Sequence, residues 1–88
     1  MRHELAWILE DIAKERNRQD EKWGEQNHDD MTWVTILGEE FGEVCHEALV
    51  YKFAEIEDAE ERLRAELIQV AAVAVAHIEC IDRRCHGV

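Results

Sequence analysis

Glutamates occupy positions in this sequence where a packed helix would carry apolar side chains. Glu40 falls on the apolar stripe that begins with Trp33, Ile36 and Leu37, and Glu43 lies three positions further on. A single carboxylate in the interior of a helical bundle costs several kcal/mol unless it is neutralised or coordinated. Two converging carboxylates also repel each other and raise each other's pKa. The register of Glu40 therefore favours a site over an ordinary solvated helix face.

A second oxygen-bearing pair, Glu66 and Gln69, lies three residues apart among apolar neighbours later in the chain. Hard divalent cations prefer oxygen ligands, and magnesium completes its shell with water and substrate phosphates. Inward-facing carboxylates on facing helices are a known way of building a metal site inside a bundle. We therefore expect a magnesium site, which manganese could also occupy. Glu39 and Glu47 either assist it from outside or face water.

Three helices account for nearly all of the chain. They are expected at about residues 2–22, 33–53 and 59–84, with a loop at 23–31 and a polar link at 55–58. Few residues interrupt a helix, because the 88 residues include no proline and only four glycines. Gly24 is expected to end the first helix, and Asp30 or Thr32 to cap the second. The fold class is all-α, with one domain over residues 1–88.

The first helix carries an apolar stripe that becomes polar halfway along: Leu5, Ile8, Leu9 and Ile12, then Glu15 or Arg16, Gln19 and Trp23. A helix that only packs against other helices seldom carries a stripe that changes from apolar to polar along its length. We expect the polar end of the stripe to line a cavity.

Apolar residues surround most of the third helix: Leu67, Ile68, Val70, Val73, Val75, Ile78 and Ile81. A helix that is apolar on nearly all sides must be covered on nearly all sides. Two further helices of one short chain are too few for this. The pattern predicts a homo-oligomer, a dimer or a tetramer, in which helices of different chains complete a bundle.

The net charge of −11, from 21 acidic residues, argues against nucleic acid as a partner, because phosphate backbones require a basic face. The three cysteines are odd in number and lack CxxC spacing, and residues 1–10 do not resemble a signal peptide. Residues 67–81 are too few to span a bilayer. We expect a cytoplasmic protein that has no membrane partner.

Two sequence motifs carry a resemblance to a known family. Residues 39–43 (EEFGE) match EExxE, and residues 66–69 (ELIQ) match ExxD except that Gln69 replaces the aspartate. Residues 16–30 (RNRQDEKWGEQNHDD) are similar to a segment of phage-type and integron-cassette proteins. The chain thus resembles the all-α NTP pyrophosphatase (MazG-like) superfamily from about residue 16 to residue 84.

The resemblance implies hydrolysis of an NTP or a dNTP to the nucleoside monophosphate and pyrophosphate. It also implies a housekeeping role in the nucleotide pool. It implies magnesium ligands at Glu40, Glu43 and Glu66, with Gln69 in the fourth ligand position. Glu39 and Glu43 are equal candidates for the general base that takes a proton from the attacking water. The neutral Gln69 predicts weaker metal binding than four carboxylates would give.

Five side chains are candidates for contacting the rest of the substrate: Gln19, Lys22, Trp23, Gln26 and Arg62. The two cations suit phosphate oxygens, the indole suits a base, and the amides suit base edges or sugar hydroxyls. Alternatively, Trp23 packs the helix end and Arg62 pairs with Glu66 or Asp58.

Two other functions stay open. The chain could be an inactive MazG-like module that binds nucleotide or metal, for which Gln69 is the best support. It could also be a purely structural helical oligomer whose glutamates face solvent.

Overall fold

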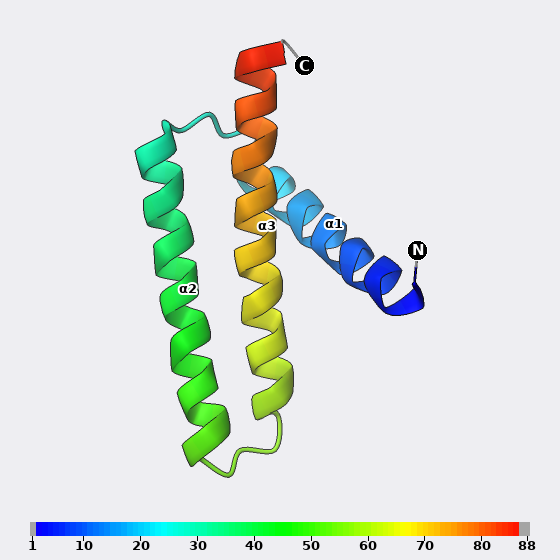
Figure 1. Ribbon diagram of the computed structural model, residues 1–88, viewed down its shortest axis with the longest axis vertical. Helices are drawn as coiled ribbons and strands as arrows, with labels where there is room; N and C mark the ends of the chain where they lie inside the picture. The colour runs from blue at the N-terminus through cyan, green and yellow to red at the C-terminus, as the bar shows by residue number, and fades with distance from the viewer. Residues whose placement is uncertain (1, 87–88) are drawn as a thin grey trace.

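Three helices form the whole of the regular structure in a computed structural model that describes residues 2–86. They are α1 (His3–Trp23), α2 (Asp30–Phe53) and α3 (Ala59–His86), and no strand occurs among the described residues. The all-α prediction is confirmed, and the helices lie close to the predicted ranges. Figure 1 shows α2 and α3 as an antiparallel hairpin, with α1 crossing α3 at a steep angle.

The loop between α1 and α2 is shorter than predicted. Gly24 ends α1, as expected, and its N–H donates to the carbonyl of Asp20 at 2.8 Å. The N-cap of α2 is Asp29, whose carboxylate accepts from the N–H of Thr32 at 2.7 Å. The assignment of the cap to Asp30 or Thr32 was therefore wrong. Both residues lie inside the first turn, because Asp29 already satisfies a free N–H there.

The long helix α3 is the common support of the other two helices. Both α1 and α2 pack against α3, and in the described chain they make no comparable contact with each other. Small side chains on α3, Ala72 and Ala76, are buried and permit close approach. Arg16 and Glu79, 2.6 Å apart, and Arg64 and Asp11, 2.7 Å apart, join α1 to α3. These pairs help to fix where α1 crosses.

Trp33 forms the centre of a small core with Val73, Ala76 and Cys80. Its indole stacks on His77 of α3, with ring centres 5.7 Å apart and planes 14° apart. His28 of the loop meets the same indole edge-on at 4.9 Å. One aromatic residue thus joins the loop, α2 and α3.

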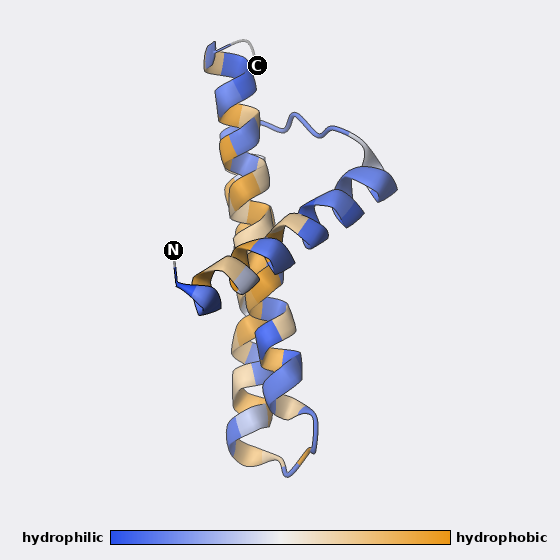
Figure 2. Cartoon of the chain, turned by 90° about the vertical axis from the view of Figure 1, so that its right-hand side faces the viewer, coloured by the Kyte–Doolittle hydropathy of each residue, from blue (hydrophilic) through white to orange (hydrophobic). Residues whose placement is uncertain are grey.

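Large apolar side chains remain exposed over much of the molecule. On α1, Leu5, Ile8 and Leu9 are 38–45% exposed, so the predicted stripe is not a core stripe within one chain. Figure 2 shows mainly hydrophobic colours in the N-terminal half of α1 and polar colours in its other half, and Figure 1 shows the N-terminal half extending away from α3. Leu67 and Ile78 of α3 are also exposed.

The shape of the chain is correspondingly open. Its radius of gyration is 14.7 Å, whereas a compact domain of this length would have about 12 Å. Its accessible surface is 6506 Å², which exceeds by roughly 1,100 Å² the area typical of a folded monomer of this mass.

We expect Gly24→Ala to destabilise the fold and Gly38→Ala to stabilise it. Gly24 has φ 71° and ψ −170°, a region open almost only to glycine, so a Cβ there costs about 1–3 kcal/mol. Gly38 lies inside α2 with open space around a built Cβ, and alanine should add about 0.5–1 kcal/mol. Urea unfolding followed by circular dichroism measures both changes. Equal effects of the two substitutions would contradict the assigned turn.

Candidate functional site

A pocket of about 220 Å³ lies where the loop and all three helices meet. Its lining residues are Gln19 and Trp23 of α1, Gln26 of the loop, Trp33, Ile36 and Glu40 of α2, and Gln69 and Val73 of α3. Five of them were singled out from the sequence: Gln19, Trp23, Gln26, Glu40 and Gln69. The structure therefore brings three predicted substrate-binding residues and two predicted metal-site residues to one cavity.

Glu40 is the acidic residue among those that line this pocket. Partial burial raises the pKa of its carboxyl, and nearby negative charges, Glu66 first and then Glu43, Glu39 and Glu15, raise it further. The predicted ligands Glu43 and Glu66 are thus close enough for their charges to raise the pKa of Glu40. Glu66 is half-buried, whereas Glu39 and Glu43 are exposed. The negative charges near Glu40 thus come from both α2 and α3.

Glu15 of α1 adds to these charges, although the sequence motifs did not identify it. Its side chain is 11% exposed and forms an ion pair with Arg18, with N–O distances of 2.6 and 2.9 Å. The hydrogen bonds from Arg18 chiefly lower the pKa of Glu15 and the contact with Gln19 adds to this, while burial opposes it. The signal that could have found it was its place on the polar continuation of the α1 stripe.

Gln19 is the one residue of α1 that is buried, at 8% exposure. Its side-chain carbonyl accepts from Arg16 at 2.9 Å, and its amide N–H donates to Glu15 at 3.3 Å. These two contacts identify the oxygen end and the nitrogen end of the Gln19 amide. The second N–H of the same amide is left for a neighbour in the pocket.

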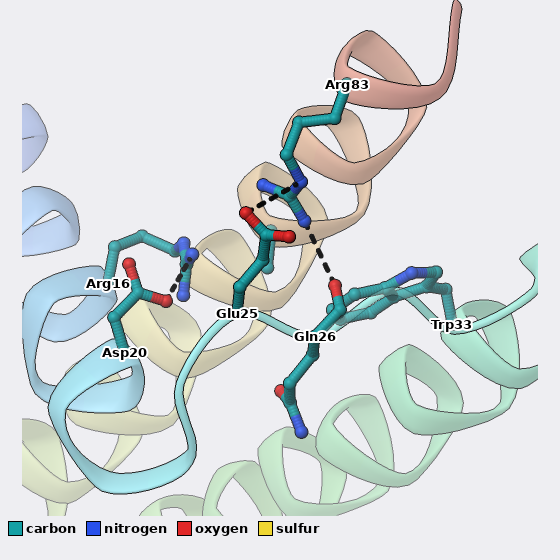
Figure 3. Close-up of a pocket in the computed structure, with 7 residues that line it drawn as sticks. Arg16, Asp20, Glu25, Gln26, Trp33 and Arg83 are labelled. Atoms are coloured by element: carbon teal, nitrogen blue, oxygen red, sulfur yellow. Dashed lines mark hydrogen bonds and ion pairs between the residues drawn. The ribbon is translucent and has the colours of Figure 1, made fainter. Parts of the chain in front are cut away.

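Arg83 of α3 holds the loop that carries Gln26. Its guanidinium donates to the carbonyl of Gln26 at 3.0 Å and to the side-chain oxygen of Asn27 at 3.0 and 3.2 Å. Glu25 lies 3.4 Å away as its ion-pair partner. Figure 3 shows the Gln26 side chain pointing away from Arg83.

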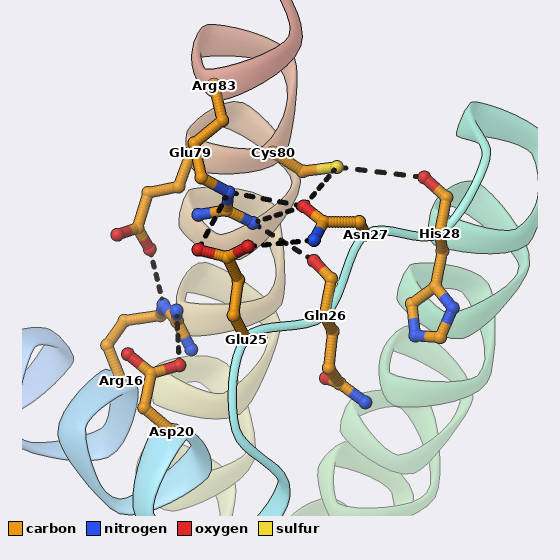
Figure 4. A network of polar contacts seen from close by, with 9 residues as sticks. All are labelled: Arg16, Asp20, Glu25, Gln26, Asn27, His28, Glu79, Cys80 and Arg83. Atoms are coloured by element: carbon orange, nitrogen blue, oxygen red, sulfur yellow. Dashed lines mark hydrogen bonds and ion pairs between the residues drawn. The ribbon is translucent and has the colours of Figure 1, made fainter. Parts of the chain in front are cut away.

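A second arginine stabilises the same end of the molecule. Arg16 donates to Glu79 at 2.6 Å and to Asp20 at 2.9 Å. Figure 4 shows this pair of contacts beside the Arg83 contacts. Arg16 and Arg83 line a pocket of about 190 Å³ together with four polar or aromatic residues and one alanine: Asp20, Glu25, Gln26, Trp33 and Ala76. Carboxylates already neutralise both arginines, so this pocket serves to position α1 and the loop.

The two predicted phosphate-binding cations have other contacts. Arg62 donates to Glu47 at 3.0 Å and so joins α3 to α2, instead of pairing with Glu66 or Asp58 as the alternative supposed. The Lys22 ammonium lies 4.7 Å from the ring centre of Trp23. Trp23 is 53% exposed, and part of its ring lines the pocket. Lys22 therefore stays near the pocket.

The donor set agrees with a hard cation, but the described side chains do not form a closed cage. Within residues 2–86, no group of three acidic, histidine or cysteine residues has the arrangement of a metal site. One buried oxygen, Oε2 of Glu47, has no hydrogen-bond partner among the described residues, and Glu47 lies one turn beyond Glu43. The other oxygen of Glu47 pairs with Arg62, so its charge is compensated, whereas the raised pKa of Glu40 marks carboxylate charge without such a partner. Carboxylate and amide oxygens are the kind of ligand that magnesium prefers, although the described side chains do not converge on one point.

No protein-family model, curated protein or solved structure matches the chain. A helix able to cross a lipid bilayer is not found in the described part of the chain. The chemistry of the site therefore has to be argued from its own geometry.

We expect Glu40→Gln to raise the melting temperature at pH 7 in metal-free buffer. The folded-state pKa of Glu40 is raised, so ionisation destabilises the fold above the ordinary glutamate pKa of about 4.3. Below that value both states are protonated and the penalty disappears. The gain should therefore shrink as the pH is lowered towards 4, which thermal unfolding over a pH series measures. Glu57→Gln, in the exposed link between α2 and α3, is the control and should change little at any pH.

Proposed function

We propose that this protein is a magnesium-dependent nucleoside triphosphate pyrophosphohydrolase, which converts an NTP or dNTP and water into the monophosphate and pyrophosphate. The observation that carries the proposal is the position of Glu40. Its carboxyl lies in the wall of a pocket that also carries amides and indoles, and the charges of Glu66, Glu43, Glu39 and Glu15 raise its pKa. A nucleotide has a flat base at one end and phosphates at the other, and this pocket offers partners for both.

Glu40, Glu43 and Glu66 would hold the metal, with Gln69 in the fourth position. Magnesium bound there would screen phosphate charge and make the attacking water more acidic. Glu39 and Glu43 are exposed carboxylates beside Glu40, and either can accept the proton of that water. Phosphoryl transfer depends mainly on positioning and charge neutralisation, which these residues supply without a covalent intermediate.

The base would lie between the indoles and amides of the pocket. Trp23 offers part of its ring, and the Nε1–H of buried Trp33 has no hydrogen-bond partner among the described residues. Gln19 offers one N–H, since its other polar atoms are already engaged. Gln26 has its backbone held by Arg83 while its side chain is directed elsewhere. Arginine contacts thus position both glutamines, through the side chain of Gln19 and the backbone of Gln26.

Lys22 is the better placed of the two candidate phosphate-binding cations, because it lies over Trp23 at the edge of the pocket. Arg62 would act indirectly. By pairing with Glu47 it compensates part of the negative charge one helical turn from Glu43 and Glu66.

We propose that the functional form is a homo-oligomer, at least a dimer. What supports this is the uncovered apolar half of α1 and the surface excess of roughly 1,100 Å² over a typical folded monomer. A stable protein–protein interface buries about 800 Å² on each partner, so a second copy could account for the excess. A cytoplasmic location fits the three free cysteines, Cys45, Cys80 and Cys85.

The enzymatic proposal predicts that magnesium raises the melting temperature of the wild-type protein and that Glu40→Gln abolishes the shift, because a ligand that binds only the folded state stabilises it.

Incubation of the protein with magnesium and a panel of NTPs and dNTPs should release pyrophosphate, and Glu40→Gln should reduce the rate of release at least a hundredfold. Glu57→Gln should retain both properties. Magnesium and nucleotide binding without any pyrophosphate release would instead favour the inactive binding module, and the absence of a magnesium shift would favour the structural oligomer.

The oligomer is tested by light scattering on a size-exclusion column. The expected mass is at least twice the chain mass of 10.3 kDa. Leu9→Glu, on the uncovered stripe of α1, should move the protein towards the monomer because it buries a charge at the interface. Asn17→Glu adds the same charge at an exposed position further along α1 and should leave the mass unchanged. A wild-type mass of 10.3 kDa at micromolar concentration would refute this part of the proposal.

A further inference from the structure

The hairpin of α2 and α3 has an apolar face that remains largely uncovered. On α2, apolar or small side chains recur every three or four residues, and all of them are exposed: Met31, Val34, Gly38, Phe41, Cys45 and Leu49. This spacing places them on one stripe along the helix. The same spacing recurs on α3, where the two most exposed members are Leu67 and Ile78: Leu63, Leu67, Val70, Ala74, Ile78 and Ile81.

The stripe on α2 is turned away from the pocket that contains Glu40. Successive residues of an α-helix are rotated by about 100° around its axis. Trp33 packs against α3. Ile36 and Glu40 are rotated to one side of Trp33, where they line the pocket. Val34 and Phe41 are rotated to the other side.

The stripe on α3 lies opposite the same pocket. Ile68 faces α1 across a neighbouring pocket, and Val73 packs in the core that α3 forms with α2. Gln69 lies between these two directions and lines the pocket that contains Glu40. The rotation per residue leaves Leu67 and Ile78 in the remaining sector of α3. The two stripes therefore form one surface on the far side of the hairpin from the pocket, which we call the hairpin face.

None of the residues that form the hairpin face is charged, although the net charge of the chain is −11. The acidic residues of α2 between positions 31 and 49 all lie off the stripe: Glu39, Glu40, Glu43 and Glu47. Centres of protein–protein interfaces are depleted in charge and enriched in aromatic residues and methionine, and exposed apolar patches mark contact surfaces. A second copy can approach this face without placing carboxylates opposite one another.

The N-terminal half of α1 projects on the same side as the hairpin face. Figure 2 shows the N-terminal end of α1 and the loop at residues 24–29 on opposite sides of the hairpin. The loop marks the side of the Glu40 pocket, because Gln26 lines that pocket. The exposed side chains of Leu5, Ile8 and Leu9 therefore lie beside the space in front of the hairpin face.

We propose that the hairpin face docks on the same face of a second copy, so that α2 and α3 of the two chains form a four-helix bundle. The N-terminal half of α1 packs against the side of the second copy. Two hairpins of antiparallel helices match each other under two-fold symmetry. The inference rests on the proposed homo-oligomer and goes beyond it, because it names the surface that joins the copies. The pocket that contains Glu40 stays open on the other side.

The size of the hairpin face fits a second copy. The stripe on α2 is about 27 Å long, and two packed helices are about 20 Å wide, so the outline covers about 500 Å². The uncovered residues of α1 add to this area. A stable interface buries about 800 Å² on each partner, and the surface excess of the chain is roughly 1,100 Å².

Val34→Glu tests the hairpin face, and Thr35→Glu is its matched control. Both side chains are β-branched and exposed, and the rotation of about 100° turns Thr35 away from the face. By light scattering on a size-exclusion column, Val34→Glu should lower the mass towards the 10.3 kDa of one chain, because it buries a charge at the interface. Thr35→Glu should keep the wild-type mass. Ile78→Glu, on the α3 stripe, should behave like Val34→Glu.

Thiol labelling tests the same face without any substitution. Cys45 lies on the α2 stripe and is exposed in one chain, so a second copy on the hairpin face would cover it. Iodoacetamide labelling of Cys45, followed by mass spectrometry of peptides, should be about tenfold slower in the oligomer than in chains dissociated by dilution. This comparison decides the matter even where Val34→Glu loses its helical content in circular dichroism.

The outcomes separate this inference from the proposed function. A wild-type mass of 10.3 kDa at micromolar concentration overturns both the hairpin face and the proposed homo-oligomer. A wild-type oligomer in which folded Val34→Glu keeps the wild-type mass overturns the hairpin face alone. The same holds where Cys45 reacts equally fast before and after dissociation. The contact through α1 would then remain.

Discussion

The half-buried carboxylate of Glu40, surrounded by like charges, is the constraint on which the rest of this structure depends. Burial and the charges of Glu66, Glu43, Glu39 and Glu15 all raise its pKa, so ionisation of Glu40 is less favourable in the folded chain than in water. A leucine at position 40 would continue the apolar stripe and remove the cost. The core that has to offset the cost is small, centred on a single tryptophan. Such an arrangement is expected where a cation or substrate compensates the charge in the working state.

Helix α3 makes the site possible because two helices use different faces of it. A pocket with walls from α1, the loop, α2 and α3 needs all of them at one level along α3. The arginine contacts supply that alignment: Arg16 ties α1 to Glu79, and Arg83 ties the loop through Gln26 and Asn27. Arg16 and Arg83 line a neighbouring pocket, which shares Gln26 and Trp33 with the pocket that contains Glu40. The two arginines thus position the elements that form the walls of both pockets.

Gln69 stands where the ExxD pattern has an aspartate, and taken alone it suggests a weakened or inactive site, since it lacks the charge of aspartate. In the folded chain Gln69 lines the pocket that contains Glu40 and also a second pocket, between α1 and α3, that Glu15 lines. Tertiary packing decides which helices face Gln69, and a motif read along one segment does not contain this information.

Hydropathy and helix-forming tendency determined the three helices, the turn at Gly24 and the inward register of Glu40, because these depend on spacing within one segment. Which faces meet was decided by tertiary structure. The apolar stripe of α1 stays uncovered while polar Gln19 is buried, and Arg62 pairs with Glu47 instead of a neighbour on its own helix. Periodicity defines the face of each helix but not the angle at which α1 crosses α3. That angle follows from close packing on small residues and from ion pairs between residues distant in sequence, which no local pattern contains.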